Sequence, residues 1–167
     1  VRATKGGTGW IKCDANYVIP TLTKKRMQKE GYMEVIFLDA ATQTYVEEGS
    51  SCNIFFVMEN GTLVTPSLED TVLPGINRIS AMQLAKDEGV KVEERRVPID
   101  EVMDRAVECF VTGTAAGVSY IESIDHKGKT RVFRESKMGD LTRQLQWKLR
   151  GTQYGIVEDS HGWMYPV

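Results

Sequence analysis

Short apolar runs separated by polar and amphipathic stretches extend along the whole chain. The apolar run at 35–38 predicts a buried strand, and residues 44–47 predict a second strand. Two further runs, at 52–58 and 62–65, flank an Asn-Gly pair. Because Asn-Gly between two apolar runs is typical of a tight turn, these runs predict a hairpin.

Helical patterns alternate with these strands. The first predicted helix covers 14–31, with Asp14 as its N-cap and Gly31 at its end, and Pro20 either marks its first turn or kinks it. The later predicted elements are a helix from Leu73-Pro74-Gly75 to about Glu88, a strand at 90–97, a helix at 99–106, a strand at 108–112, a hairpin of strands 118–124 and 129–133, and a helix at 140–149. Strands and helices mixed in one layered core predict an α/β (α+β) fold, with residues 1–167 as a single domain.

Composition limits the classes of function. The chain has 167 residues, 26% of them charged, and a formal net charge of −2, so it has no basic surface for nucleic acid. No apolar run approaches the roughly 18 residues of a membrane span. Three widely spaced cysteines indicate reduced thiols, and two histidines argue against a histidine-rich metal site. We therefore expect a cytoplasmic protein that binds no nucleic acid, membrane or metal.

Two patches carry candidate chemistry. Lys12 stands among glycines and small polar residues, five positions before Tyr17, and the carboxylate pair Glu47 and Glu48 directly precedes an apolar strand. A lysine amine that forms a Schiff base and a carboxylate that holds a pyridinium proton are what a pyridoxal phosphate enzyme requires. Because neighbouring side chains on a strand face opposite sides, one glutamate can face a pocket, and Glu48 is better placed. The alternative interpretation is that these groups are solvated surface charges.

Two glycine-containing segments suit an anion. Gly75-Ile76-Asn77 begins a helix, where free N–H groups and the helix dipole favour negative charge. Gly113-Thr114-Ala115 ends a strand in small residues, which let a ligand approach the backbone closely. In the alternative interpretation, Asn77 only caps its helix and the glycines only serve turns.

Taken in order, these segments resemble the branched-chain aminotransferases, pyridoxal phosphate enzymes of fold type IV, over almost the whole chain. The resemblance rests on Gly6-Gly7-Thr8-Gly9 with Lys12, Asn16 and Tyr17, on Glu48-Gly49 with Asn53-Ile54-Phe55, on Leu73-Pro74-Gly75-Ile76, on Gly113-Thr114-Ala115, and on the tail from Gln153 to Trp163. It implies the large, cofactor-binding domain of that family, a mixed-sheet pseudo-barrel with surrounding helices.

The resemblance also implies roles around the ring of pyridoxal 5′-phosphate. Lys12 would form the Schiff base and move a proton between substrate and cofactor. Tyr17 would hydrogen-bond the phenolic oxygen, Glu48 would pair with the protonated pyridine nitrogen, and Leu73 would pack on the ring.

The remaining implied roles concern negatively charged groups. Ile76 and Asn77 would donate to the phosphate, together with Thr114, and the backbone N–H groups of Thr114 and Ala115 would receive the substrate carboxylate. The implied reaction is transamination of leucine, isoleucine or valine with 2-oxoglutarate, by a homodimer whose ligands are small amino acids and 2-oxo acids. A D-amino-acid aminotransferase or an aminodeoxychorismate lyase on the same fold is an alternative.

The chain departs from the family pattern in several respects. Asp14-Ala15 replaces two small residues, Asn77 replaces a threonine, and the small N-terminal domain of the family is absent from this chain. The opening at Val1 therefore resembles an interior point of a longer protein, and the truncation would impair activity. These departures motivate one further alternative, a non-catalytic remnant that acts as a binding or assembly module.

Overall fold

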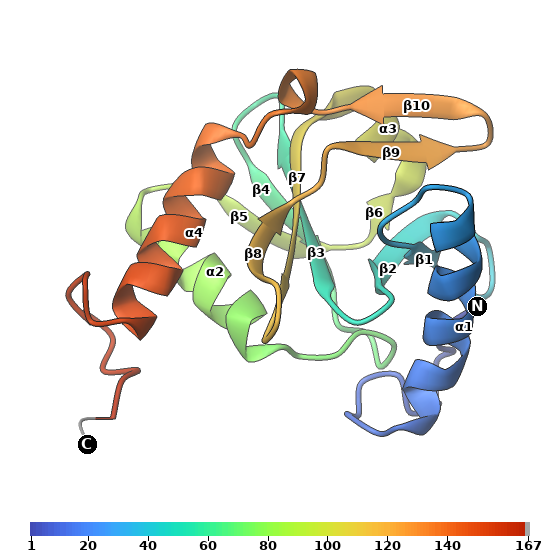
Figure 1. Ribbon diagram of the computed structural model, residues 1–167, viewed down its shortest axis with the longest axis horizontal. Coiled ribbons are helices and arrows are strands. Elements are labelled where there is room, and N and C mark those ends of the chain that lie inside the picture. Colours follow the sequence, from blue (N-terminus) through green and yellow to red (C-terminus); the bar gives the residue numbers. More distant parts are fainter. Residues whose placement is uncertain (166–167) are drawn as a thin grey trace.

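The computed structural model describes residues 1–165, and its strands form three sheets (Figure 1). In the largest sheet the strand order is β5-β4-β3-β7-β8, with β4 and β5 parallel and the other pairs antiparallel. Its members are β3 (Asn53–Met58), β4 (Leu63–Pro66), β5 (Val92–Arg95), β7 (Ala106–Gly113) and β8 (Gly117–Tyr120). The β3–β4 pairing confirms the hairpin predicted from Asn-Gly, and the mixed sheet confirms the predicted fold class.

The two smaller sheets lie beside the large one. In the first, the strand order is β1-β2-β6, and in the second β9 pairs with β10. Their members are β1 (Ile36–Leu38), β2 (Tyr45–Gly49), β6 (Val97–Pro98), β9 (Ser123–His126) and β10 (Lys129–Val132). Within the described residues the strands do not close into a barrel.

Alternating side chains of β3 separate two hydrophobic clusters. Phe55 and Val57 pack on one side, where α2 (Ile76–Asp87) and α4 (Asp140–Gln153) cover the sheet. Ile54 and Phe56 pack on the other side, against β2, β6 and α3 (Ile99–Arg105). Because both faces are covered, all six positions of β3 are buried, as its continuous apolar run predicts.

The helix α1 (Ala15–Lys29) lies apart from these clusters, and Pro20 is its one buried residue (Figure 1). Pro20 lies inside the helix and not in its first turn. Asp14 occupies the N-cap position, as predicted, but its side chain makes no capping bond. None of the helices in residues 1–165 combines the length and apolar character needed to cross a membrane.

The prediction of one strand over 118–124 is also wrong. The strand β8 ends at Tyr120 in the large sheet, and the chain then crosses to β9, which pairs with β10 alone. The crossing is fixed by a bond from the N–H of Ile121 to the carbonyl of Cys109. The predicted turn between the two strands is present, so the hairpin begins at Ser123 and not at Val118.

Candidate active site

One cavity of about 290 Å³ lies where the loop before α1, the β2–β3 turn, the start of α2 and the end of β7 meet. Residues from segments far apart in the sequence line it together. Among them are seven residues that the sequence singles out: Lys12, Tyr17, Glu48, Leu73, Ile76, Asn77 and Thr114. Ala115 is exposed and is not among the lining residues.

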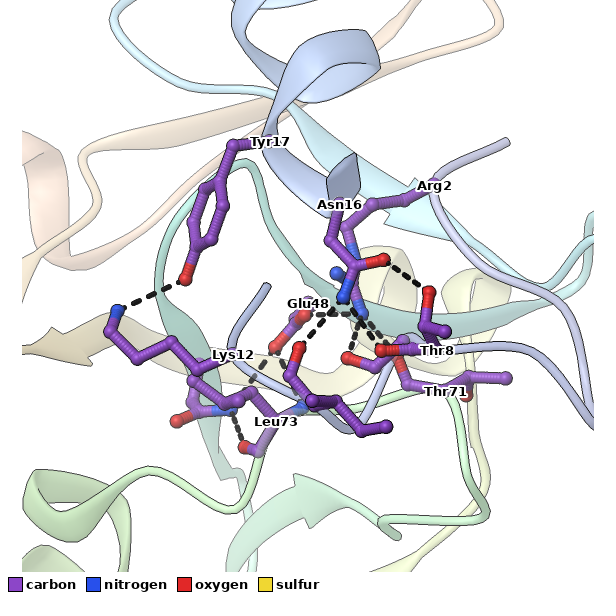
Figure 2. Close-up of polar contacts among 11 residues, drawn as sticks. Arg2, Thr8, Lys12, Asn16, Tyr17, Glu48, Thr71 and Leu73 are labelled. Carbon is purple, nitrogen blue, oxygen red and sulfur yellow. Dashed lines mark hydrogen bonds and ion pairs between the residues drawn. The ribbon is translucent and has the colours of Figure 1, made fainter. Parts of the chain in front are cut away.

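The loop that carries Lys12 is held by the first turn of α1. Asn16 donates to the carbonyls of Thr8 and Ile11 at 2.6 and 2.7 Å, and accepts the hydroxyl of Thr8 at 2.8 Å (Figure 2). Lys12 Nζ donates at 3.1 Å to the hydroxyl of Tyr17, the residue that follows Asn16 in α1. Because Asn16 fixes the loop and Tyr17 binds the amine, the amine is held at the wall of the cavity.

Glu48 lies on another wall of this cavity and is buried. One of its oxygens pairs with Arg2 at 2.5 Å, and the other accepts the backbone N–H of Leu73 and the amide of Asn53, each at 3.3 Å (Figure 2). Glu47 lines a different cavity, so the two glutamates face opposite sides of β2, as alternation along a strand predicts.

Arg2 was not identified from the sequence. Its side chain is 5% exposed, and besides Glu48 it donates to the carbonyl of Gly9 at 3.1 Å. It also donates to the carbonyl of Thr71, a partner 69 residues away. Since its partners are distant in the chain, no local pattern at Arg2 indicates a role in the cavity.

Burial raises the pKa of Glu48 to about 7. The positive charge of Arg2 and the hydrogen bond from the N–H of Leu73 oppose this rise. Glu47 next to it raises the pKa further. Arg2 is therefore the group that favours the charged form of Glu48 in a site where burial disfavours it.

This pKa predicts how stability changes with pH. Because the folded value lies above the ordinary 4.5, the folded chain binds more protons than the unfolded chain between about pH 4.5 and 7. The contribution of Glu48 is present below pH 4.5 and is lost as pH rises through about 7. Urea unfolding at pH 5 and pH 8 should show a larger loss of stability in the wild type than in Glu48→Gln. Equal losses would contradict this pKa.

The start of α2 faces the same cavity. Gly75 precedes the helix, and the first N–H groups of a helix, here those of Ile76 and Asn77, have no partner within it. The side-chain amide of Asn77 donates to the carbonyl of Gly113 at 2.8 Å, so it joins the helix to the end of β7. The two segments expected to hold an anion therefore lie together. Asn77 does not cap α2, because the N-cap residue is Gly75.

Gly75 is required by close packing. A Cβ atom at this position would lie 2.2 Å from Oδ1 of Asn53, far inside contact distance. Asn53 in turn donates to the carbonyl of Leu73 at 2.8 Å. The turn before α2 is therefore packed directly against the strand that follows Glu48.

A second residue missed by the sequence analysis, Glu34, fixes the β2–β3 turn. One of its oxygens accepts the N–H groups of Val35 at 2.8 Å and Ser50 at 3.1 Å, together with the hydroxyl of Ser50. The other oxygen pairs with Lys24 of α1 at 2.8 Å. Because Ser50 and Cys52 line the cavity, Glu34 connects one wall of the cavity to α1.

We expect Glu34→Ala to lower the free energy of unfolding by about 1–3 kcal/mol, because it leaves the donors of Ser50 without their acceptor. Urea denaturation would measure the loss. Glu30→Ala removes an exposed glutamate from the segment between α1 and β1, which also carries Glu34. This substitution should change the free energy of unfolding by less than about 0.5 kcal/mol. Equal effects of the two substitutions would show that Glu34 does not hold the turn.

The cavity presents three kinds of group on separate walls. Lys12 supplies an amine, Glu48 a carboxylate paired with arginine, and the start of α2 supplies backbone donors for an anion. Such a set suits a ligand with a protonated ring nitrogen at one end and a phosphate at the other. Asp14 is exposed and does not line the cavity.

Comparison with known proteins gives a family match over most of the chain. The family model described as amino-transferase class IV matches residues 14–124, which include Tyr17 and Glu48 and begin two residues after Lys12. A probable branched-chain-amino-acid aminotransferase of Staphylococcus aureus (strain N315) is 41% identical over 172 residues, covering 100% of this chain and 48% of that protein. Branched-chain-amino-acid aminotransferase 3, chloroplastic, of Arabidopsis thaliana is 41% identical over 162 residues, covering 97% of this chain and 39% of that protein.

Solved structures give the same result. The branched-chain amino acid aminotransferase from Escherichia coli matches with a TM-score of 0.84 and 33% identity, over 97% of this chain and 52% of that one. A second branched-chain amino acid aminotransferase, from the organism abbreviated T.th., was solved with pyridoxamine 5′-phosphate. It matches with a TM-score of 0.86 and 31% identity, over 98% of this chain and 52% of that one. The same enzyme complexed with N-(5′-phosphopyridoxyl)-L-glutamate matches with the same TM-score and identity, over 98% of this chain and 53% of that one. The chain spans about half the length of the relatives it matches.

Proposed function

The chain belongs to the class IV amino-transferases, and on that premise we propose that residues 1–167 form the single cofactor-binding domain of a branched-chain amino-acid aminotransferase. One observation carries the proposal: Lys12, Glu48 and the start of α2 line one cavity. The choice of substrate class is supported by relatives with 41% identity that are named branched-chain-amino-acid aminotransferases.

Pyridoxal 5′-phosphate is the proposed cofactor. Its phosphate suits the first N–H groups of α2 and the hydroxyl of Thr114, and its pyridine nitrogen suits Glu48. Relatives of known structure contain pyridoxamine 5′-phosphate and a phosphopyridoxyl-glutamate compound. When bound, the cofactor supplies an aldehyde that reacts with amines and a ring that withdraws electrons from the substrate.

Each residue of the chain then has a defined task. The amine of Lys12 would hold the cofactor and would take up the proton from the substrate. Tyr17 orients that amine through their 3.1 Å hydrogen bond. Glu48 would hold a proton on the pyridine nitrogen, and Arg2, which lies 2.5 Å from Glu48, favours the charged form of Glu48.

Leu73 would pack against the ring, while the substrate carboxylate would bind the backbone N–H groups of Thr114 and Ala115. The proposed amino donors are L-leucine, L-isoleucine and L-valine. We propose 2-oxoglutarate as the acceptor because a relative was solved with a compound of the cofactor and L-glutamate, the amino acid formed from 2-oxoglutarate. The working enzyme is proposed to be a homodimer, and the isolated 167-residue chain to have impaired activity.

The test is a half-reaction. The purified protein is mixed with pyridoxal 5′-phosphate, and absorbance at the edge of the visible range reports covalent attachment. Addition of L-leucine should then remove the band and release 4-methyl-2-oxopentanoate. D-alanine and aminodeoxychorismate are run in parallel, and a faster reaction with either would replace this proposal with one of the alternatives on the same fold. Cofactor binding without any turnover would indicate a non-catalytic binding module.

A further inference from the structure

The side-chain amide of Asn53 lies between Glu48 and the turn that begins α2. Asn53 is the first residue of β3, is buried, and lines the candidate active-site cavity. Its Nδ2 atom donates to the carbonyl of Leu73 at 2.8 Å and to Oε2 of Glu48 at 3.3 Å. The nitrogen of an amide carries two N–H groups, so each acceptor receives one of them. The donor capacity of the Asn53 side chain is therefore used entirely to join these two groups.

The backbone of Leu73 joins the same groups. Its N–H donates to Oε2 of Glu48 at 3.3 Å, and its carbonyl accepts the N–H of Gly75 at 2.8 Å in addition to the amide of Asn53. Asn53, Glu48 and Leu73 therefore form a closed set of hydrogen bonds. Because Gly75 directly precedes α2, this set connects the carboxylate of Glu48 to the first turn of the helix.

Asn53 also determines how closely the turn approaches the sheet. Its Oδ1 atom would lie 2.2 Å from a Cβ atom at Gly75, so the turn packs against the amide at a distance that only glycine allows. The backbone of Asn53 is held in the large sheet, where it pairs with Thr112 of β7. A side chain that a strand supports holds its partners more precisely than one on a loop.

We propose that Asn53 is a positioning residue that sets the spacing between Glu48 and the first N–H groups of α2. This inference rests on the proposed function, in which the pyridine nitrogen of the cofactor faces Glu48 and its phosphate faces those N–H groups. A short covalent link joins the ring to the phosphate, so both ends gain from their partners only when the protein groups have the matching spacing. Loss of the Asn53 amide frees the turn from Glu48, and the phosphate then contributes less to binding.

The test compares pyridoxal 5′-phosphate with pyridoxal, which lacks the phosphate. The absorbance band is titrated with each ligand, the signal of Lys12→Ala is subtracted, and the ratio of the two dissociation constants gives the contribution of the phosphate. We expect Asn53→Ala to lower this ratio at least tenfold. A loss of folded protein weakens binding of both ligands by the same factor, so it leaves the ratio unchanged. Asn60→Ala removes an exposed amide between β3 and β4, outside the cavity lining, and should leave the ratio within twofold of the wild type.

Asn53→Leu repeats the comparison with a side chain of similar shape that donates no hydrogen bond, so the space left by alanine does not decide the result. It should lower the ratio to a similar extent. A fall of less than tenfold in either variant would overturn the positioning role, and Asn53 would then only supply donors to two buried acceptors. A wild-type protein that gives no band with pyridoxal 5′-phosphate would instead overturn the proposed function, and this inference with it.

Discussion

Lys12→Ala is expected to abolish the absorbance band that pyridoxal 5′-phosphate gives with this protein, and to lower the rate of the L-leucine half-reaction by at least about 10³-fold. The amine of Lys12 lines the cavity and is held by Tyr17. Among the described residues, Lys12 is the one lysine in the lining, so no second amine replaces it in position. Titration of the variant with cofactor, followed by rapid mixing with L-leucine, measures both losses.

The matched control is Lys25→Ala, which removes an exposed lysine of α1 that does not line the cavity. Its band and its rate should equal those of the wild type. If Lys12→Ala keeps the band while Lys25→Ala loses it, the covalent attachment has been assigned to the wrong lysine. If both variants keep it, the band arises from non-specific reaction with surface lysines.

Local chemistry made part of this site predictable. Lys12, Tyr17 and Glu48 stand within short segments whose residue types already indicate a cofactor. Strand alternation lets one of the two glutamates face a pocket, and the place of Glu48 at the exit of the strand favours it over Glu47. The structure brings these residues to one cavity. The start of α2 was predicted for the same reason, because a glycine followed by a helix is a local feature.

Interactions that depend on distant partners were not predictable. Arg2 pairs with Glu48 and donates to the carbonyl of Thr71, and Glu34 accepts the N–H of Ser50. The partners in these bonds are 16 to 69 residues apart in the sequence. Nothing in the residues around Arg2 or Glu34 indicates those partners. The break between β8 and β9 was missed for a related reason, since the apolar pattern continues through Ile121 while the pairing changes from one sheet to another.

The alternation of β2 has a consequence beyond the choice of glutamate. One strand presents Glu48, which is paired with Arg2, to one cavity and Glu47 to another. Glu47 and Glu48 influence each other, because each carboxylate raises the cost of charging the other. Removal of the Glu47 charge should therefore favour the charged form of Glu48.

Glu48→Gln is expected to slow the L-leucine half-reaction on the order of 10²-fold or more, because removing one preorganised electrostatic partner has effects of that size. Glutamine keeps the shape of the side chain and can still accept a hydrogen bond from Arg2, but it cannot hold a proton on the pyridine nitrogen by charge. The expected signature is a large fall in rate with cofactor still attached to Lys12. Rapid mixing with L-leucine measures the rate, and the absorbance band measures the attachment.

Glu101→Gln is the matched control, because it also removes a partly buried glutamate that pairs with an arginine, in this case Arg95 at 2.6 Å. It lies outside the lining of the cavity, so its half-reaction should match the wild type within about twofold. If both variants slow equally, the effect comes from a general loss of stability. If Glu48→Gln reacts at the wild-type rate, the pyridine nitrogen does not depend on Glu48. Arg2 and Glu48 would then form a structural ion pair, and the proposed orientation of the cofactor would be wrong.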